Sequence, residues 1–135
     1  RPEWRTVFLI DAFDVQVRVN PCPWLRRGVL YVGSETEELK SNRNPWMLLR
    51  FHDLGGRFND WYRSRVHAGT LTLNCGIIGG FRDLVLRFLG QMVSILEDPG
   101  LAVRKRHDQE INVDMAVMNF VLHAEFDSGE VVTGQ

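Results

Sequence analysis

Near its start the chain reads Val7-Phe8-Leu9-Ile10-Asp11-Ala12-Phe13-Asp14, four apolar residues followed closely by two carboxylates. Two of the four are β-branched, and an unbroken apolar run of this length is typical of a strand that is covered on both faces. The carboxylates then follow the carboxyl end of the strand, where open α/β sheets bind their ligands. This stretch predicts an α/β fold with an acidic site at one edge of its sheet.

The two carboxylates suggest a metal site. Bringing Asp11 and Asp14 together is unfavourable unless a cation or a proton neutralises them. Oxygen ligands suit Mg²⁺ or Mn²⁺, which commonly bridge protein carboxylates to phosphate groups. The residues alone leave a second interpretation open, in which Asp11 and Asp14 only form a turn.

A second strand is predicted over residues 70–80, where the chain reads Thr-Leu-Thr-Leu-Asn-Cys-Gly-Ile-Ile-Gly-Gly. Such a strand can deliver Asn74 to a site, and Gly76 lets a ligand approach the backbone because it has no Cβ. The alternative is a strand with a bulge at Gly76. Gly79 and Gly80 are weak evidence of phosphate binding and equally suit a loop before a helix.

Two helices are expected in the second half of the chain. Residues 81–97 carry an apolar stripe at spacings of three and four and end at Asp-Pro-Gly, which predicts an amphipathic scaffold helix. Residues 108–123 are expected to form a second helix in which Asp108 can cap the amino end and Asn119 lies outside the buried stripe, which consists of Ile111, Met115, Met118 and Leu122. Asp114 and Asn119 are five residues apart, about 140° around a helix. They can therefore act at one site only if Asp114 lies at or before the first turn; alternatively, Asp114 is a solvated surface acid.

Two shorter apolar runs, 29–32 and 131–135, also read as strands. Between the first of these and residue 70, the segment 36–68 carries Trp46, Trp61, two histidines and several arginines. Indole rings stack on the apolar faces of sugars, so this segment is a possible lid or acceptor-side insertion. A peripheral subdomain with its tryptophans packed inward is the alternative.

Taken in order, Asp11-Ala-Phe-Asp14, Asn74-Cys-Gly76 and Asp114-Met-Ala-Val-Met-Asn119 resemble the catalytic part of glycosyltransferases of the GT-A fold. The nearest similarity is to the glycogenin and galactosyltransferase group and to the glycosyltransferase domain of procollagen lysyl hydroxylases. The resemblance implies a Rossmann-like fold, a mixed sheet with flanking helices. It also implies transfer of a hexosyl group from a nucleotide diphosphate sugar to a hydroxyl-bearing acceptor, either a glycan or a protein.

The resemblance also implies roles for individual residues. Asp11 and Asp14 form the family's Asp-x-x-Asp motif, which binds Mn²⁺ (or Mg²⁺) and the diphosphate, with Asp14 as the direct ligand. Asn74 and Gly76 contact the donor sugar. Asp114 contacts the sugar hydroxyls or faces the reaction, as the catalytic residue.

Three further residues belong to the same implied site. Asn119 faces the donor and the acceptor. Glu35 belongs to the Ser-Glu pair that ends the strand after the Asp motif, as in the lysyl hydroxylase domains. The family has Gln where this chain has Met115. An alternative alignment on Asp108-Gln109 restores that Gln but puts the following Asn at position 112, and it makes Asp108 the catalytic candidate.

The size and composition suit a single, partial catalytic domain over residues 1–135. The 44% hydrophobic content supports a core, but the resembled families place a nucleotide-binding half before the Asp motif, so we expect a fragment that lacks it. A net charge of -1, from 16 basic and 17 acidic residues, predicts no nucleic-acid partner. No apolar run is long enough for a membrane segment. Cys22 and Cys75 fit free thiols or a disulfide, so both the secretory-pathway lumen and the cytoplasm stay open.

Two other classes of function remain open. One is a non-catalytic sugar- or protein-binding module on the same fold, in which the acids are idle and no divalent metal binds. The other is a metal-dependent phosphohydrolase or nuclease, which uses paired acids at a strand end equally well. Sugar transfer is predicted only by the glycosyltransferase hypothesis and distinguishes it from both of these alternatives.

Overall fold

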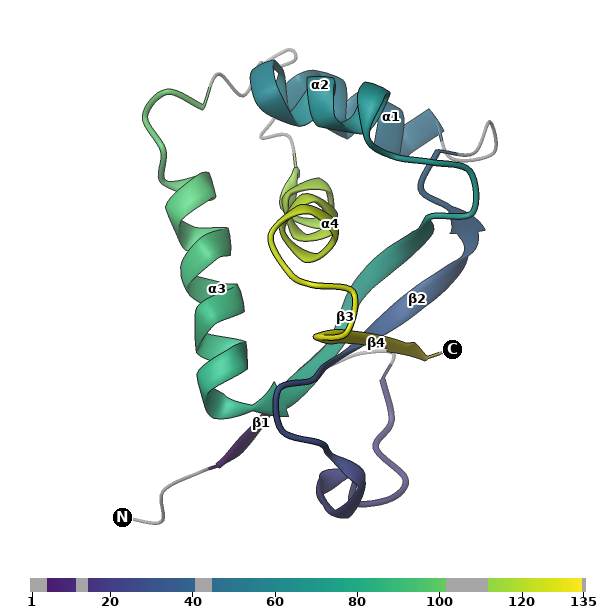
Figure 1. Cartoon of the computed structure of the whole chain (residues 1–135), viewed down its shortest axis with the longest axis vertical. Coiled ribbons are helices and arrows are strands. Elements are labelled where there is room, and N and C mark those ends of the chain that lie inside the picture. The colour runs from purple at the N-terminus through teal and green to yellow at the C-terminus, as the bar shows by residue number, and fades with distance from the viewer. Residues whose placement is uncertain (1–4, 12–14, 41–44, 102–111, 135) are drawn as a thin grey trace.

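A four-stranded sheet flanked by helices makes up the fold (Figure 1). The computed structural model describes residues 5–11, 15–40, 45–101 and 112–134. The strands are β1 (Thr6–Ile10), β2 (Leu30–Glu38), β3 (Leu71–Phe81) and β4 (Val131–Gly134). Their order is β1-β3-β2-β4, with β3 antiparallel to β1 and β2, and β4 parallel to β2. The predicted α/β class and mixed sheet are confirmed.

Four α-helices and one short 3₁₀ helix lie in the described ranges. They are η1 (Cys22–Trp24), α1 (Pro45–Leu54), α2 (Gly56–Ser64), α3 (Arg82–Leu96) and α4 (Asp114–Ala124). Figure 1 shows α3 running along one side of the molecule, α1 and α2 forming its upper end, and α4 enclosed between them and the sheet. No helix in the described ranges is both long and apolar enough to cross a membrane.

Helix α4 is the centre of the core. Every side chain from Ala116 to Leu122 is buried, so the helix has no polar face along its middle two turns. The prediction that Asn119 lies outside the buried stripe is therefore wrong, because α4 is covered by the sheet, by α3 and by α1 with α2. The predicted start at Asp108 is also wrong: Asn112 and Val113 are not helical, and the helix begins at Asp114.

Helix α3 follows β3 without a loop. The amphipathic helix predicted over 81–97 is confirmed, with Leu84, Val85, Phe88 and Ile95 buried. Gly79 and Gly80 are part of β3, as the strand predicted over 70–80 has them, and they do not form the alternative loop before the helix. A Cβ on Gly79 would lie 2.1 Å from the Phe8 ring, and one on Gly80 would lie 2.8 Å from the Val29 carbonyl oxygen. The glycine pair allows neighbouring strands to approach.

Strand β1 lies at an edge of the sheet and pairs with β3. Its residues are half-buried and Ile10 is 44% exposed, so the prediction of a strand covered on both faces is wrong. Val7 and Leu9 pack against the core, while Phe8 points to the opposite face of the sheet. An apolar run does not distinguish one covered face from two when the second face is itself apolar.

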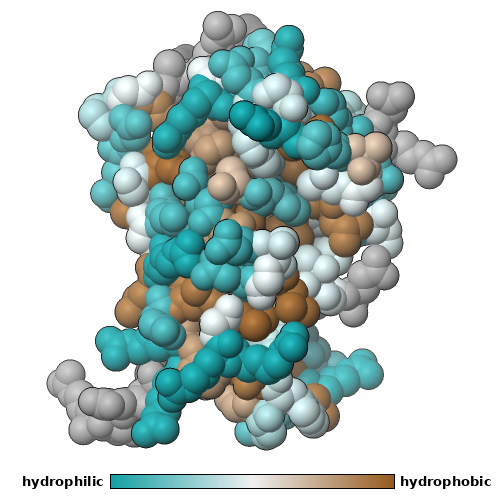
Figure 2. All heavy atoms as spheres, in the orientation of Figure 1, coloured by the Kyte–Doolittle hydropathy of each residue, from teal (hydrophilic) through white to brown (hydrophobic). Residues whose placement is uncertain are grey.

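That second face carries an open apolar hollow of about 480 Å³. All four strands contribute to it, through Phe8, Tyr31, Ile77 and Val132 together with Gly33 and Gly134. Figure 2 shows that hydrophobic side chains also reach the surface at several places elsewhere, between hydrophilic ones. The helices thus cover one face of the sheet and leave apolar surface on the other.

The segment 36–68 contains the end of β2 and both helices α1 and α2. Met47, Phe51, Phe58 and Tyr62 from these helices belong to the same buried cluster as α4. Trp61 packs against this cluster, whereas Trp46 is 38% exposed. The two helices are therefore part of the single core, with one tryptophan turned inward and one at the surface.

Candidate functional site

The pairing of β2 with β3 is irregular at two successive places. Val32 pairs with Ile78 and Gly33 with Asn74, so residues 75–77 of β3 have no partner in β2. Ser34 then pairs with Leu73 and Glu38 with Leu71, so residues 35–37 of β2 bulge as well. Bulges re-aim side chains and occur next to active sites more often than elsewhere in sheets. Here they bring Glu35 and the Asn74-Cys75-Gly76 segment together.

Asn74 joins the two bulges. Its side-chain Nδ2 donates a hydrogen bond to Glu35 Oε1, and its Oδ1 accepts one from the Gly76 N–H at 2.5 Å. A Cβ on Gly76 would lie 2.7 Å from that same oxygen, so a larger residue here would displace the Asn74 amide. The bulge interpretation of Gly76 is therefore confirmed, and the amide of Asn74 fixes the orientation of the Glu35 carboxylate.

Asp11 and Asp114 approach the same segment from two other elements. The Asp11 N–H donates to the Gly76 carbonyl oxygen at 2.8 Å, which extends the pairing of β1 with β3. Asp114 is the first residue of α4; its Oδ1 accepts from the Met115 N–H at 2.6 Å, and its own N–H donates to Asn112 Oδ1. Asp114 thus lies in the first turn, which the sequence requires if it is to act together with Asn119.

The carboxylates of Asp114, Asp11 and Glu35 all lie near enough to Cys75 to act on its thiol. Although the thiol reaches the surface, partial burial raises its pKa, and the carboxylates of Asp114, Asp11 and Glu35 raise it further, against an opposing hydrogen bond to its own backbone. Three acids distant in the sequence therefore act on one thiol. The potential at this point of the surface is negative, which attracts cations and hydroxyl donors.

Asn119 lies beneath this site and is fully buried. Its Oδ1 accepts from the Leu73 N–H at 2.8 Å, and its Nδ2 donates to the carbonyl oxygens of Leu73 and Met115, both at 2.9 Å. The amide is thus bound to the backbone of β3 and α4. It holds α4, and with it Asp114, against the strand that carries Asn74.

The described residues include carboxylates of the type that binds a divalent metal, but too few of them lie together to hold one. Among residues 5–11, 15–40, 45–101 and 112–134, no three His, Cys, Asp or Glu side chains form a group that could hold a metal ion. Mg²⁺ is commonly held by one or two carboxylates together with phosphate oxygens and waters. Asp11 supplies one exposed carboxylate, while Asp14 and Asp108, two of the predicted site residues, lie outside the described residues.

Sequence reasoning missed Cys75 as the point on which the acids converge. It also did not foresee that Glu35 and Asn74 form a direct pair. Gly76 signals a possible bulge in β3, but nothing in the sequence indicates the bulge in β2 or which residues the two shifts bring together, so only the tertiary structure reveals these contacts.

Five of the predicted site residues come together, namely Asp11, Glu35, Asn74, Gly76 and Asp114. They come from β1, β2, β3 and the first turn of α4. Comparison with protein-family models, with curated proteins and with solved structures gave no match to this chain.

Proposed function

We propose that this chain is part of the catalytic domain of a glycosyltransferase that moves a hexosyl group from a nucleotide diphosphate sugar to a hydroxyl of a glycan or protein. The observation that supports the proposal best is the meeting of Asp11, Glu35, Asn74, Gly76 and Asp114 around one pair of bulges. The mixed sheet with flanking helices is compatible with the Rossmann-like GT-A fold that the sequence resembles.

The described residues have distinct parts in this proposal. Asn74 holds Glu35 in place, and the Glu35 carboxylate accepts hydrogen bonds from hydroxyls of the donor sugar. The backbone of Gly76 holds two of the site residues in place, because its N–H donates to Asn74 Oδ1 and its carbonyl oxygen accepts from the Asp11 N–H. These contacts orient the sugar before it reacts, which lowers the entropic part of the barrier.

Asp114 faces the acceptor in this proposal. One of its oxygens accepts from the Met115 N–H, which leaves the other to accept the proton of the incoming hydroxyl. The buried hydrogen bonds of Asn119 keep the first turn of α4 beside β3, so Asn119 acts as a positioning residue.

A metal belongs to the same proposal. Mn²⁺ or Mg²⁺ held by Asp11 and Asp14 would neutralise the charge that accumulates on the departing diphosphate.

The experiment is a thermal-shift titration, with Mn²⁺ and a panel of nucleoside diphosphates and nucleotide sugars, of the complete catalytic domain that contains this chain. A ligand that binds only the folded state raises the melting temperature. We expect one nucleotide to stabilise the chain only when metal is present, with loss of the effect in Asp11→Asn and Asp14→Ala. Asp60→Asn, an exposed acid on α2, is the matched control and should keep it.

An activity assay separates the proposal from its competitors. The protein and the stabilising nucleotide sugar are incubated with glycoside and peptide acceptors, and the products are identified by mass spectrometry. Sugar transfer that is lost in Asp114→Asn supports the proposal. Metal-dependent cleavage of nucleic acid or phosphate esters without transfer would replace it with the phosphohydrolase hypothesis, and the absence of any metal or nucleotide effect would leave the binding module.

A further inference from the structure

A second hollow lies at the opposite end of α4 from Asp114. It is formed by the end of α2, the connection from α2 to β3, and the last turn of α4, and its volume is about 440 Å³. Cavities of roughly 300–1,000 Å³ are typical of small-molecule sites. Helix α4 has 11 residues, so about 15 Å separate this hollow from the candidate transferase site. The two sites are therefore distinct.

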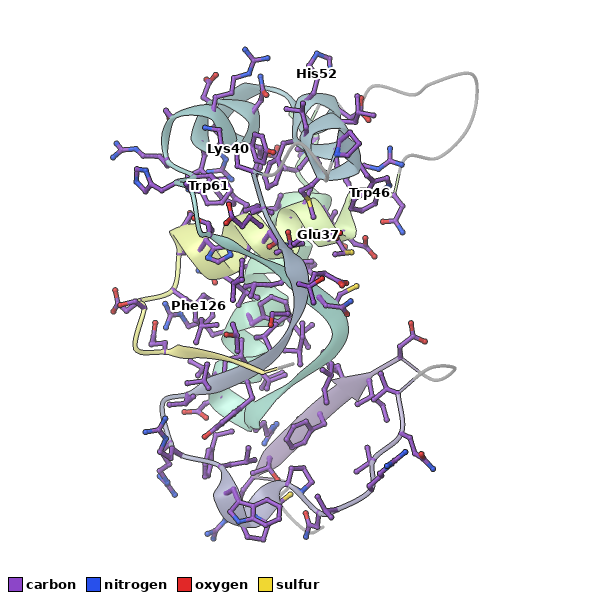
Figure 3. All side chains as sticks on the ribbon, turned by 90° about the vertical axis from the view of Figure 1, so that its right-hand side faces the viewer. Glu37, Lys40, Trp46, His52, Trp61 and Phe126 are labelled. Atoms are coloured by element: carbon purple, nitrogen blue, oxygen red, sulfur yellow. The ribbon has the colours of Figure 1, made fainter. Side chains whose placement is uncertain are left out.

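The wall of the hollow holds one permanent positive charge, the guanidinium of Arg65, and the imidazole of His67 lies beside it as a further hydrogen-bonding group. None of the described lining residues is acidic. Within the described part of the chain, neither side chain makes a hydrogen bond or an ion pair. Near Val66 of the wall, the Lys40 Nζ lies 2.8 Å from the Arg63 carbonyl oxygen and 3.4 Å from that of Val66. In Figure 3, Lys40 and Trp61 are both labelled in the upper part of the molecule. An anion is the complementary ligand for these groups.

A neutral histidine adds a polar group of another kind. Burial lowers the pKa of His123, so its ring is uncharged at neutral pH. Its Nε2 lies 3.0 Å from the Leu71 carbonyl oxygen, and because a carbonyl can only accept, Nε2 must carry the proton. Nδ1 is then an acceptor. Together with the Thr70 hydroxyl it gives the wall groups that suit ligand hydroxyls.

Trp61 gives the hollow a rigid apolar surface. Its indole packs against Phe51 and Phe120, with ring centroids 5.5 Å and 5.3 Å away. The His123 ring lies nearly parallel to it at 6.5 Å. A half-buried indole fixed in this way offers a surface on which a ring can stack.

We propose that this hollow, the Trp61 pocket, binds a small organic anion, a phosphate monoester of a ring compound. The phosphate lies toward Arg65 and His67, and the ring packs on Trp61. Charge selects the phosphate and the aromatic surface selects the ring, so both parts of the ligand contribute to affinity. This inference goes beyond glycosyl transfer and does not depend on it.

The test is an NMR titration of the chain with phenyl phosphate, followed at the Trp61 indole N–H. We expect saturable shifts, weaker binding of inorganic phosphate, and weaker binding of the uncharged phenyl β-glucoside. Arg65→Ala should raise the Kd for phenyl phosphate about tenfold, since a charge-assisted hydrogen bond is lost. His67→Ala should act in the same direction. Arg63→Ala is the matched control, because this arginine lies on the same stretch outside the pocket and its Nε donates to Asn59 Oδ1 at 3.3 Å.

Three results would overturn the proposal: no saturation with phenyl phosphate, equal affinity for phenyl β-glucoside, or an unchanged Kd in Arg65→Ala. Arg65 and His67 are exposed, so we expect both variants to fold and melt like the parent chain. Metal and nucleotide titrations at the other end of α4 report on glycosyl transfer, so the failure of either proposal is recognised separately.

Discussion

At the scale of single residues, Asn119 is the side chain on which the arrangement of the site depends most. Its buried amide satisfies both backbone groups of Leu73 and the carbonyl of Met115. We predict that Asn119→Ala lowers the free energy of unfolding by about 2–4 kcal/mol, because buried backbone groups lose their partners. Urea denaturation measures this change.

Asn59→Ala provides the comparison. This asparagine interacts through an exposed hydrogen bond with Arg63, and its removal should change the free energy of unfolding by no more than about 0.5 kcal/mol. Equal effects of the two substitutions would contradict the role assigned to Asn119.

Cys75 provides a chemical probe of the converging acids. The carboxylate of Asp114 raises the pKa of the thiol, so Asp114→Asn should lower that pKa and increase the thiolate fraction. We predict a few-fold faster reaction with iodoacetamide at pH 8, because tenfold in thiolate corresponds to one pKa unit. The rate is measured by mass spectrometry in a Cys22→Ser background.

Asp83→Asn is the control, since Asp83 lies in the first turn of α3 and has no part in the pKa shift of Cys75. An Asp114→Asn rate equal to that of the control would show that the carboxylate does not act on the thiol.

At the scale of elements, the contact between β1 and β3 depends on Gly79. A Cβ there would lie 2.1 Å from the Phe8 ring. We predict that Gly79→Ala destabilises the fold by about 1–3 kcal/mol, as overpacking does. In the Gly79→Ala background, Phe8→Ala should cost less stability than it does in the parent chain, because removing the ring relieves the contact. A double-mutant cycle by urea denaturation measures the coupling.

Gly90 in α3 is the matched glycine. A Cβ on Gly90 would meet nothing within 4 Å, so Gly90→Ala should stabilise the chain by about 0.5–1 kcal/mol through helix propensity. Independent, additive effects of Phe8→Ala and Gly79→Ala would contradict the close contact.

An ion pair joins α3 to the start of β4. The Asp127 N–H donates to Glu130 Oε2 at 3.0 Å, and Arg87 Nη1 donates to Glu130 Oε1 at 2.6 Å. Both lower the pKa of Glu130, and the bond from the Asp127 backbone has the larger effect. A lowered folded-state pKa stabilises the fold above the unfolded value, about 4.3, and this contribution is lost as the pH falls through the folded value.

We therefore predict that Glu130→Gln lowers stability at pH 7 by at most about 1 kcal/mol, because the pair is partly exposed. The difference from the parent chain should become smaller as the pH falls below about 4.3 and Glu130 becomes protonated. Urea midpoints at pH 7 and pH 2.5 test this, with Glu97→Gln as the control. A difference at pH 2.5 as large as that at pH 7 would show that packing, not charge, is responsible.

The elements also show what sequence patterns can and cannot predict. Helix α3 has one covered face, so its periodicity predicts it nearly to the residue. Helix α4 is covered on all sides, so its apolar residues show no clear period, and the pattern assigns Asn119 to the wrong environment. The start of α4 is missed because Asp108 is a capping residue by type, whereas the residue that precedes the helix is Val113, which forms no side-chain cap.

At the scale of the whole molecule, the candidate site is predicted better than the sheet that builds it. Asp11 follows a predicted strand, Asn74 lies within one and Glu35 ends one, and Asp114 opens a helix in the resembled families; in the structure these residues come together. The antiparallel pairing of β3 with both neighbours and its two register shifts are not predicted, because pairing depends on contacts distant in sequence. The Trp61 pocket is missed for the same reason, since His123 and Arg65 are neighbours only in the folded chain.

The complete enclosure of α4 also determines how the molecule opens. Amide hydrogens of a helix at the surface exchange with solvent after a local fluctuation, whereas those of α4 are reached only when α1, α2, α3 and the sheet separate from it. We expect the amides of residues 117–122 to exchange at the rate of global unfolding and those of α1 to exchange faster. Hydrogen–deuterium exchange in this one helix would then measure the free energy of global unfolding.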